Sequence, residues 1–121
     1  MISKIKIAPP NSLVFISDSN GGVPPRPVRG AWILSTPSCI SVGCLTFADG
    51  ETEFTLGPSE AVIGADPLRF DGELETPHRT VIVSTVEDKT ILKAQVPTTK
   101  TRVRIWTNRP THPDKVTIGL G

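Results

Sequence analysis

Apolar and polar residues alternate along most of this chain, in short intervals bounded by glycine or proline. Residues 3–7, for example, place Ile5 and Ile7 on one side of an extended backbone and Lys4 and Lys6 on the other. A period of two indicates strands that bury one face. The twelve prolines and ten glycines leave almost no interval long enough for a helix. The pattern therefore predicts an all-β fold of about eight or nine strands, paired antiparallel as a sandwich or a partly open barrel.

The segments between breakers differ in how clearly they predict their connections. The strongest hairpin signal joins residues 40–47 to residues 51–56, because Asp49-Gly50 supplies the two positive φ angles of a type I′ turn. Residues 18–30 are too rich in glycine and proline to pair centrally and are expected to form the longest loop. The remaining strands are expected at residues 3–7, 13–17, 31–35, 68–76, 80–86, 102–108 and 115–121.

Residues 78–96 form the only long interval without glycine or proline. A helix competes here, since Thr85 and Asp88 resemble a capping box before a stretch at 89–95 that is long enough for two turns. The β-branched run at 80–86 and the turn-forming residues 87–89 favour a hairpin instead.

Size and composition are those of a globular protein. The 121 residues are enough for one domain, 1–121, and the apolar content is 37%. The apolar runs are too short to cross a bilayer, and the amino end lacks the uninterrupted apolar region of a secretory signal, so no membrane partner and a cytoplasmic location are expected. Cys39 and Cys44 fall on opposite faces of one strand, which predicts two reduced thiols rather than a disulfide.

The net charge of +1 conceals a strong segregation of charge along the chain. Residues 1–44 carry +3, residues 45–75 carry −7 and residues 76–121 carry +5. Alternation gathers these charges into two stripes. The acidic stripe comprises Asp71, Glu73 and Glu75, supported by Glu51 and Glu53; the basic stripe comprises Arg102, Arg104 and Trp106.

Two interpretations of the stripes follow. If their strands are neighbours, the charges are cross-strand pairs on a solvated face, each contributing about 0.2–1 kcal/mol. The functional alternative is that the acidic stripe meets a basic protein, or that the Arg-Trp stripe meets an acidic one, because concentrated charge steers association. An acid-rich face would also imitate the phosphates that a nucleic-acid enzyme binds.

Several other functions find little support in the residues. His78 and His112 stand beside prolines in turn-like surroundings without a nucleophile, so no catalytic residue is assigned. The two cysteines and two histidines lack metal-ligand spacing, and no cofactor motif is present. One tryptophan beside two arginines is too little for a base-stacking surface, which argues against nucleic acid as a partner. Residues 24–29 match a Pro-x-x-Pro-x-Arg ligand of polyproline-binding domains, but short matches of this kind are common, and a stiff loop between strands is the favoured interpretation.

Two hairpin-like stretches resemble the competence protein J family of nuclease inhibitors. They are residues 40–56, and residues 92–107, where a strand, a Pro-Lys turn and a strand ending in Trp-Thr follow in order; residues 21–38 depart from the family. The resemblance implies a small β protein that binds and inhibits a nuclease. We therefore expect a non-enzymatic protein-binding domain. The alternative is a subunit of a homo-oligomer that pairs through an exposed edge such as residues 115–121.

Overall fold

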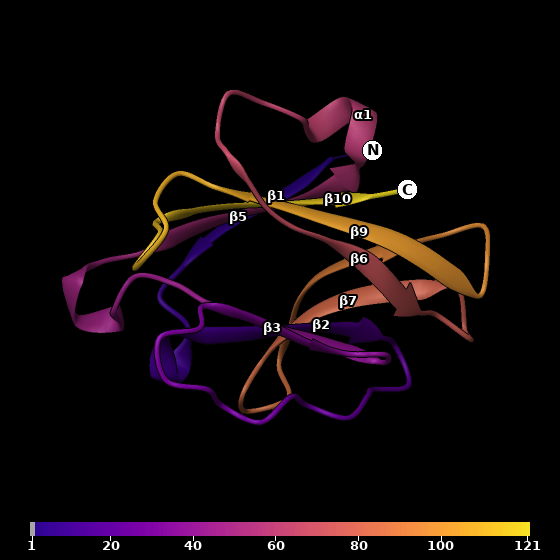
Figure 1. Cartoon of the computed structure of the whole chain (residues 1–121), viewed down its shortest axis with the longest axis horizontal. Helices are drawn as coiled ribbons and strands as arrows, with labels where there is room; N and C mark the ends of the chain where they lie inside the picture. The colour runs from indigo at the N-terminus through magenta and orange to yellow at the C-terminus, as the bar shows by residue number, and fades with distance from the viewer. Residues whose placement is uncertain (1) are drawn as a thin grey trace.

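Two five-stranded sheets face each other in the computed structural model, which describes residues 2–121 (Figure 1). Sheet A has the strand order β1-β5-β10-β9-β6, and sheet B has the order β3-β4-β2-β7-β8. Neighbouring strands are antiparallel except β5 and β10, which are parallel. The predicted sandwich is confirmed, with ten strands and open sheets rather than a barrel. The strands are β1 (Ser3–Ile7), β2 (Leu13–Asp18), β3 (Ile33–Thr36), β4 (Cys39–Gly43), β5 (Thr52–Pro58), β6 (Leu68–Glu75), β7 (Thr80–Thr85), β8 (Thr90–Gln95), β9 (Lys100–Thr107) and β10 (Lys115–Leu120).

Helical structure is confined to short connections. The helix α1 (Ser59–Val62) follows β5 directly and packs against β5 and β10 on the outer face of sheet A. Figure 1 shows it beyond the sheet, close to both chain ends. Two single 3₁₀ turns, Pro10–Ser12 and Phe47–Asp49, lie at crossings between the sheets.

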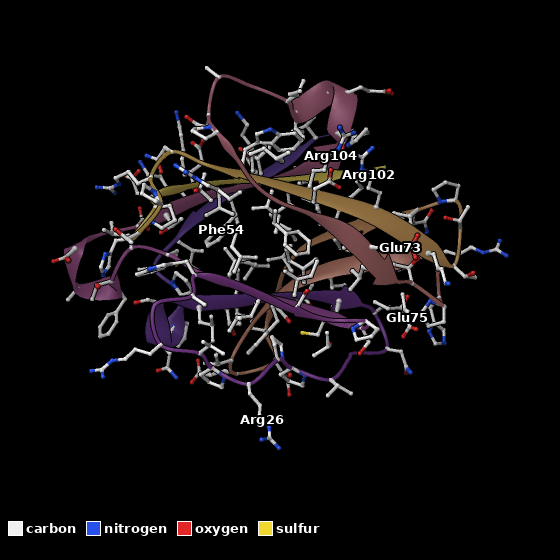
Figure 2. All side chains as sticks on the ribbon, viewed as in Figure 1. Arg26, Phe54, Glu73, Glu75, Arg102 and Arg104 are labelled. Atoms are coloured by element: carbon white, nitrogen blue, oxygen red, sulfur yellow. The ribbon has the colours of Figure 1, made fainter. Side chains whose placement is uncertain are left out.

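The core fills the space between the sheets with alternate residues of the facing strands. Phe54 of β5 has no exposed surface, and Leu56 and Leu74 are buried with it, as the alternation predicted (Figure 2). Burying such a side chain stabilises the fold by about 1.5–3 kcal/mol. The other core residues with no exposed surface are Val14, Ile16, Ile40, Val42, Val81, Val83, Val103, Ile105, Val116 and Ile118.

The hairpin predicted across Asp49-Gly50 is wrong. β4 pairs with β2 and β3 in sheet B, whereas β5 pairs with β1 and β10 in sheet A. Asp49 ends a 3₁₀ turn, and Gly50 has a φ of 136° with an extended ψ of −166°, so the segment is a crossing between sheets rather than a type I′ turn. A turn preference is local and small, and strand pairing along both edges of β4 and of β5 outweighs it.

The hairpin interpretation of residues 78–96 is confirmed, and the competing helix is wrong. β7 and β8 pair antiparallel, with Val81 opposite Ala94 and Val83 opposite Leu92. Asp88 adopts a φ of 61° in the tight connection, where the Thr85 main-chain N–H bonds to the Lys89 carbonyl at 2.9 Å. Short polar residues such as aspartate tolerate this left-handed conformation.

Two further expectations have opposite outcomes. Residues 19–32 contain no helix or strand, so the long loop is confirmed; its Val23 is held by Thr36 and Ser38 side chains. The segment at 115–121 is not an exposed edge, because β10 lies between β5 and β9. The oligomer suggested through that edge is therefore overturned. The edges of sheet A are β1 and β6, and those of sheet B are β3 and β8.

Candidate interaction surface

The two predicted charge stripes lie side by side on the outer face of sheet A. β6 and β9 are hydrogen-bonded neighbours, with Asp71 opposite Arg104, Glu73 opposite Arg102 and Glu75 opposite Lys100. All three carboxylates are exposed, as the alternation predicted. The pattern was readable in the sequence, but the adjacency of the two strands was one of two alternatives, and the structure selects it.

Only part of the acidic stripe is neutralised by this adjacency. Arg102 donates from Nε to Asp71 Oδ1 at 2.9 Å and from Nη2 to Oδ2 at 2.7 Å, in a two-pronged pair. The hydrogen bonds from Arg102 lower the pKa of Asp71, and the same contact raises the pKa of Arg102. Because Arg102 reaches diagonally to Asp71, it does not pair with Glu73. Within residues 2–121 no ion pair forms on Glu73 or Glu75.

The tryptophan of the basic stripe is buried. Trp106 is only 5% exposed, and its ring lies close to Gly119 of β10, which Ser59 of α1 also approaches. The Arg104 guanidinium carbon lies 5.9 Å from the ring centroid, and Arg104 Nη2 donates to the Gly121 main-chain oxygen at 2.9 Å. The expectation of an exposed Arg-Trp anchor is therefore wrong for Trp106, which cannot reach a partner without displacing α1.

The five predicted carboxylates do not form one cluster. Glu53 lies on β5, which β10 and β9 separate from β6, and its register neighbours are Lys6 of β1 and Lys115 of β10. Glu51 precedes β5 at the same end of the sheet. Sequence alternation put these residues on the same face, but it could not show how far apart in the sheet their strands lie.

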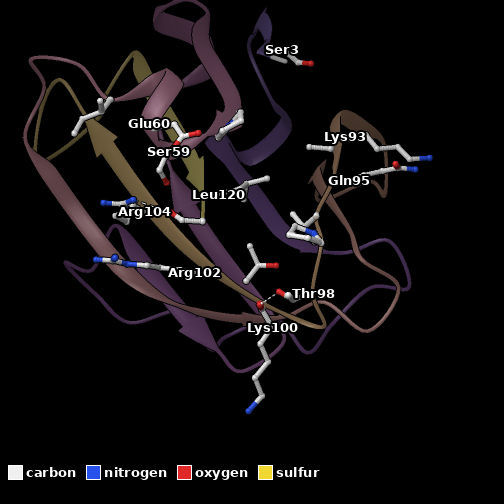
Figure 3. Close-up of a pocket in the computed structure, with 18 residues that line it drawn as sticks. Ser3, Ser59, Glu60, Lys93, Gln95, Thr98, Lys100, Arg102, Arg104 and Leu120 are labelled. Atoms are coloured by element: carbon white, nitrogen blue, oxygen red, sulfur yellow. Dashed lines mark hydrogen bonds between the residues drawn. The ribbon is translucent and has the colours of Figure 1, made fainter.

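A groove that the sequence did not indicate opens beside the stripes, at the end of sheet A where β5 and β10 finish and β9 begins. Its volume is about 870 Å³. Figure 3 shows Arg102 and Arg104 on one side of Leu120 and Lys93 and Gln95 on the other, with Ser59 and Glu60 of α1 above. Residues of β1, β5, α1, β8, β9 and β10 contribute to it, so no local pattern could have revealed it.

Both histidines are exposed, and one of them, His78, is hydrogen-bonded to a buried aspartate. His78 Nδ1 lies 2.8 Å from Oδ2 of buried Asp18, and the His78 main-chain N–H donates to Asp18 Oδ1 at 2.9 Å. Burial raises the pKa of Asp18, but hydrogen bonds from the main chain of Asn20 and from His78 outweigh it, so the pKa is lowered. No hydroxyl or thiol among the described residues hydrogen-bonds to the His78 ring. The contact ties the β6–β7 connection to β2, a structural role that the sequence did not predict.

Neither thiol has the properties of a nucleophile. Cys39 and Cys44 are buried and unbonded to each other, and burial raises the pKa of Cys39 to about 11. A thiol is nucleophilic as its thiolate, which such a pKa suppresses at neutral pH. Residues 2–121 bring together no group of three or more potential metal-ligating His, Cys, Asp or Glu side chains. The same residues include no helix with the length and apolarity that a membrane span requires.

Comparison with known proteins gives a match in structure but not in sequence. No protein-family model and no curated protein sequence matches the chain. ComJ from Bacillus subtilis, an inhibitor of the DNA-degrading activity of NucA, superposes with a TM-score of 0.72 at 11% identity, over 99% of this chain and 97% of ComJ. The protein solved as Crocagin biosynthetic gene J superposes with a TM-score of 0.58 at 10% identity, over 99% of this chain and 96% of that one. The chain therefore has the fold of ComJ over its whole length, in agreement with the resemblance seen in the sequence.

Proposed function

We propose that this protein is a non-enzymatic binding domain that inhibits a basic, nuclease-like enzyme through the exposed acidic edge of sheet A. The observation that carries the proposal is the pair of exposed carboxylates Glu73 and Glu75, which have no ion-pair partner within residues 2–121 although β9 beside them is basic. The fold shared with a nuclease inhibitor also supports an inhibitory role.

Strand β6 also presents main-chain groups to a partner. It is an edge strand, so one side of its main chain has no neighbouring strand. Glu75 N–H donates away from β9, to the Pro37 carbonyl at 2.9 Å, and by alternation the main-chain groups of Asp71 and Glu73 also point away from β9. A partner can therefore contact both the carboxylates and the unpaired main chain of one strand.

The charge pattern suits an enzyme that binds nucleic acid. Carboxylates two residues apart on a strand lie about 7 Å apart, so they present negative charge in a regular row. An enzyme that neutralises phosphates carries clustered lysine and arginine, and a row of carboxylates attracts the same cluster. Complementary charge of this kind accelerates association and suppresses wrong partners.

A charge-reversal experiment tests the proposal. The protein is immobilised and used to capture partners from a lysate of its native cells, the captured protein is identified and purified, and its cleavage of DNA is measured with and without the inhibitor. Glu73→Lys/Glu75→Lys is expected to weaken binding by about 100-fold or more and to abolish inhibition, without lowering the melting temperature.

The matched control is Glu87→Lys/Asp49→Lys, which changes the same charge at two exposed sites away from β6. This control is expected to bind and inhibit like the parent protein. The proposal is wrong if the captured partner has no nuclease activity, or if both double variants inhibit it equally.

A further inference from the structure

The groove at the end of sheet A combines an apolar floor with a basic rim. Leu120, Val96 and Pro97 give it apolar surface, and four cationic side chains line it against the single carboxylate of Glu60. The four cations are Lys93, Lys100, Arg102 and Arg104. One of the four, Arg102, is already paired with Asp71. The two lysines extend outward from the rim in Figure 3, and both are exposed and without an ion pair among the described residues, so they are free to turn toward a bound segment. Its volume of about 870 Å³ is within the usual range for ligand sites.

One wall of the groove is an unpaired strand edge. β8 is the last strand of sheet B and pairs only with β7. Val96 N–H donates to the Arg79 carbonyl at 2.9 Å, so Val96 and Ala94 face β7. By alternation the main-chain N–H and C=O groups of Lys93 and Gln95 face the other way, toward the groove that these residues line. Unpaired edge groups of this kind are the element that strand addition uses.

Buried polar atoms without partners lie at the far side of the same groove. Ser59 is 4% exposed, and its Oγ has no hydrogen-bond partner among the described residues; the same is true of Arg104 Nε. Buried hydroxyl and guanidinium groups are nearly always hydrogen-bonded, because an unsatisfied one destabilises the fold. Both residues line the groove, and Figure 3 shows the Ser59 side chain directed from α1 toward Arg104.

We propose that this groove binds an extended, acidic segment of a partner protein, which adds a strand to β8. The segment's main chain pairs with Lys93 and Gln95, its apolar side chains lie on Leu120 and Pro97, and its carboxylates meet the basic rim. A peptide explains the free strand edge, which a compact small molecule leaves unused, and the excess of positive charge selects acidic sequences. This surface adjoins the carboxylates of Glu73 and Glu75, whose register neighbours Arg102 and Lys100 line the groove, but its occupation requires no nuclease.

Fluorescence anisotropy with a synthetic peptide tests the proposal without the partner. The probe is a fluorescein-labelled, N-acetylated hexapeptide of alternating glutamate and valine, and the reference is the same peptide with glutamine in place of glutamate. The acidic peptide is expected to bind saturably and the glutamine peptide at least tenfold more weakly. Lys93→Gln/Lys100→Gln is expected to weaken binding of the acidic peptide by about fivefold to tenfold. The matched control Lys6→Gln/Lys89→Gln, at exposed sites outside the groove, is expected to leave it unchanged.

Two further measurements separate strand addition from simple charge attraction. Peptides N-methylated on alternate amides present a blocked edge on one side only, so one of the two methylated series is expected to lose binding and the other to keep it. Gln95→Pro removes a donor that β7 does not use and is expected to abolish binding with the fold intact; if that variant does not fold, the methylated peptides decide. Ser59→Ala is expected to weaken binding without lowering the melting temperature.

Several outcomes overturn the proposal. They are equal binding of the acidic and glutamine peptides, insensitivity to Lys93→Gln/Lys100→Gln, and equal binding of both methylated series. Sedimentation that shows a dimer dissociated by Gln95→Pro identifies a second copy of the chain as the occupant. Native mass spectrometry that finds a small organic anion displaced by Ser59→Ala identifies a metabolite instead. None of these results bears on inhibition through Glu73 and Glu75.

Discussion

Gly119 lies where sheet A, Trp106 and α1 meet, and the structure leaves no room there for a side chain. A Cβ added there would lie 2.6 Å from Ser59 Oγ, 2.7 Å from Trp106 Cζ3 and 2.9 Å from Ser59 Cα. One of these contacts is with the main chain, so rotation of a side chain does not relieve all of them. Gly119→Ala therefore requires α1 to move away from sheet A.

The expected cost is an overpacking penalty of about 1–3 kcal/mol in the free energy of unfolding. The direction of the change in stability is diagnostic, because replacing a glycine in a strand interior by alanine otherwise stabilises the protein by about 0.5–1 kcal/mol. Gly64→Ala is the matched control. Its nearest atom to a new Cβ is the Val62 carbonyl oxygen at 3.9 Å, so it is expected to change stability by no more than about 0.5 kcal/mol.

Urea unfolding in a Trp32→Phe background measures the effect, since Trp106 is then the single tryptophan. Gly119→Ala is expected to lower the unfolding midpoint and to shift the native emission of Trp106 to longer wavelength, because displacement of α1 exposes the ring to water. If Gly119→Ala unfolds at the same urea concentration as Gly64→Ala, or at a higher one, the packing of α1 on Trp106 is not as described.

Two further predictions concern buried groups in sheet B. The pKa of Asp18 lies below its ordinary value of 3.8 in the folded protein, so its contribution to stability is present above that value and is lost as the pH falls through the lowered pKa. Asp18→Asn is expected to lower the free energy of unfolding by about 1–3 kcal/mol at neutral pH. It is also expected to reduce the loss of stability at acid pH, which urea midpoints measured across the acid range would show. An unchanged dependence on pH would contradict the lowered pKa of Asp18. Cys39 and Cys44 are expected to resist a disulfide-exchange reagent in mildly alkaline buffer and to react fully in denaturing urea, because burial both shields the thiols and raises their pKa. Rapid labelling of the native protein would show that β4 opens readily.

Much of the fold was predictable because its signals are local. A period of two assigns the strands and their buried faces, so it correctly places Phe54, Leu56 and Leu74 in the core. The β7–β8 hairpin was also predictable, since its β-branched arms and its short turn are adjacent in sequence. The error at Asp49-Gly50 arose from the same kind of signal, because a turn preference says nothing about which strands lie beside β4 and β5.

The candidate site was less predictable than the fold. Glu73 and Glu75 were identified from alternation alone, and their exposure is as expected. The burial of Trp106 was not predictable, because Gly119 and Ser59, which lie beside it, come from other parts of the chain. The groove was invisible for the same reason.

The sequence by itself determined that the chain forms strands, which residues of each strand face inward, and that acidic and basic residues form separate stripes. Only the tertiary structure decided that the acidic and basic strands are neighbours, that Arg102 neutralises Asp71 and leaves Glu73 and Glu75 unpaired, and that β8 keeps an open edge beside a groove. The physical reason is that the side-chain period of a strand is a property of consecutive residues. The order of strands in a sheet instead depends on contacts between distant segments, which form only when the whole core is buried.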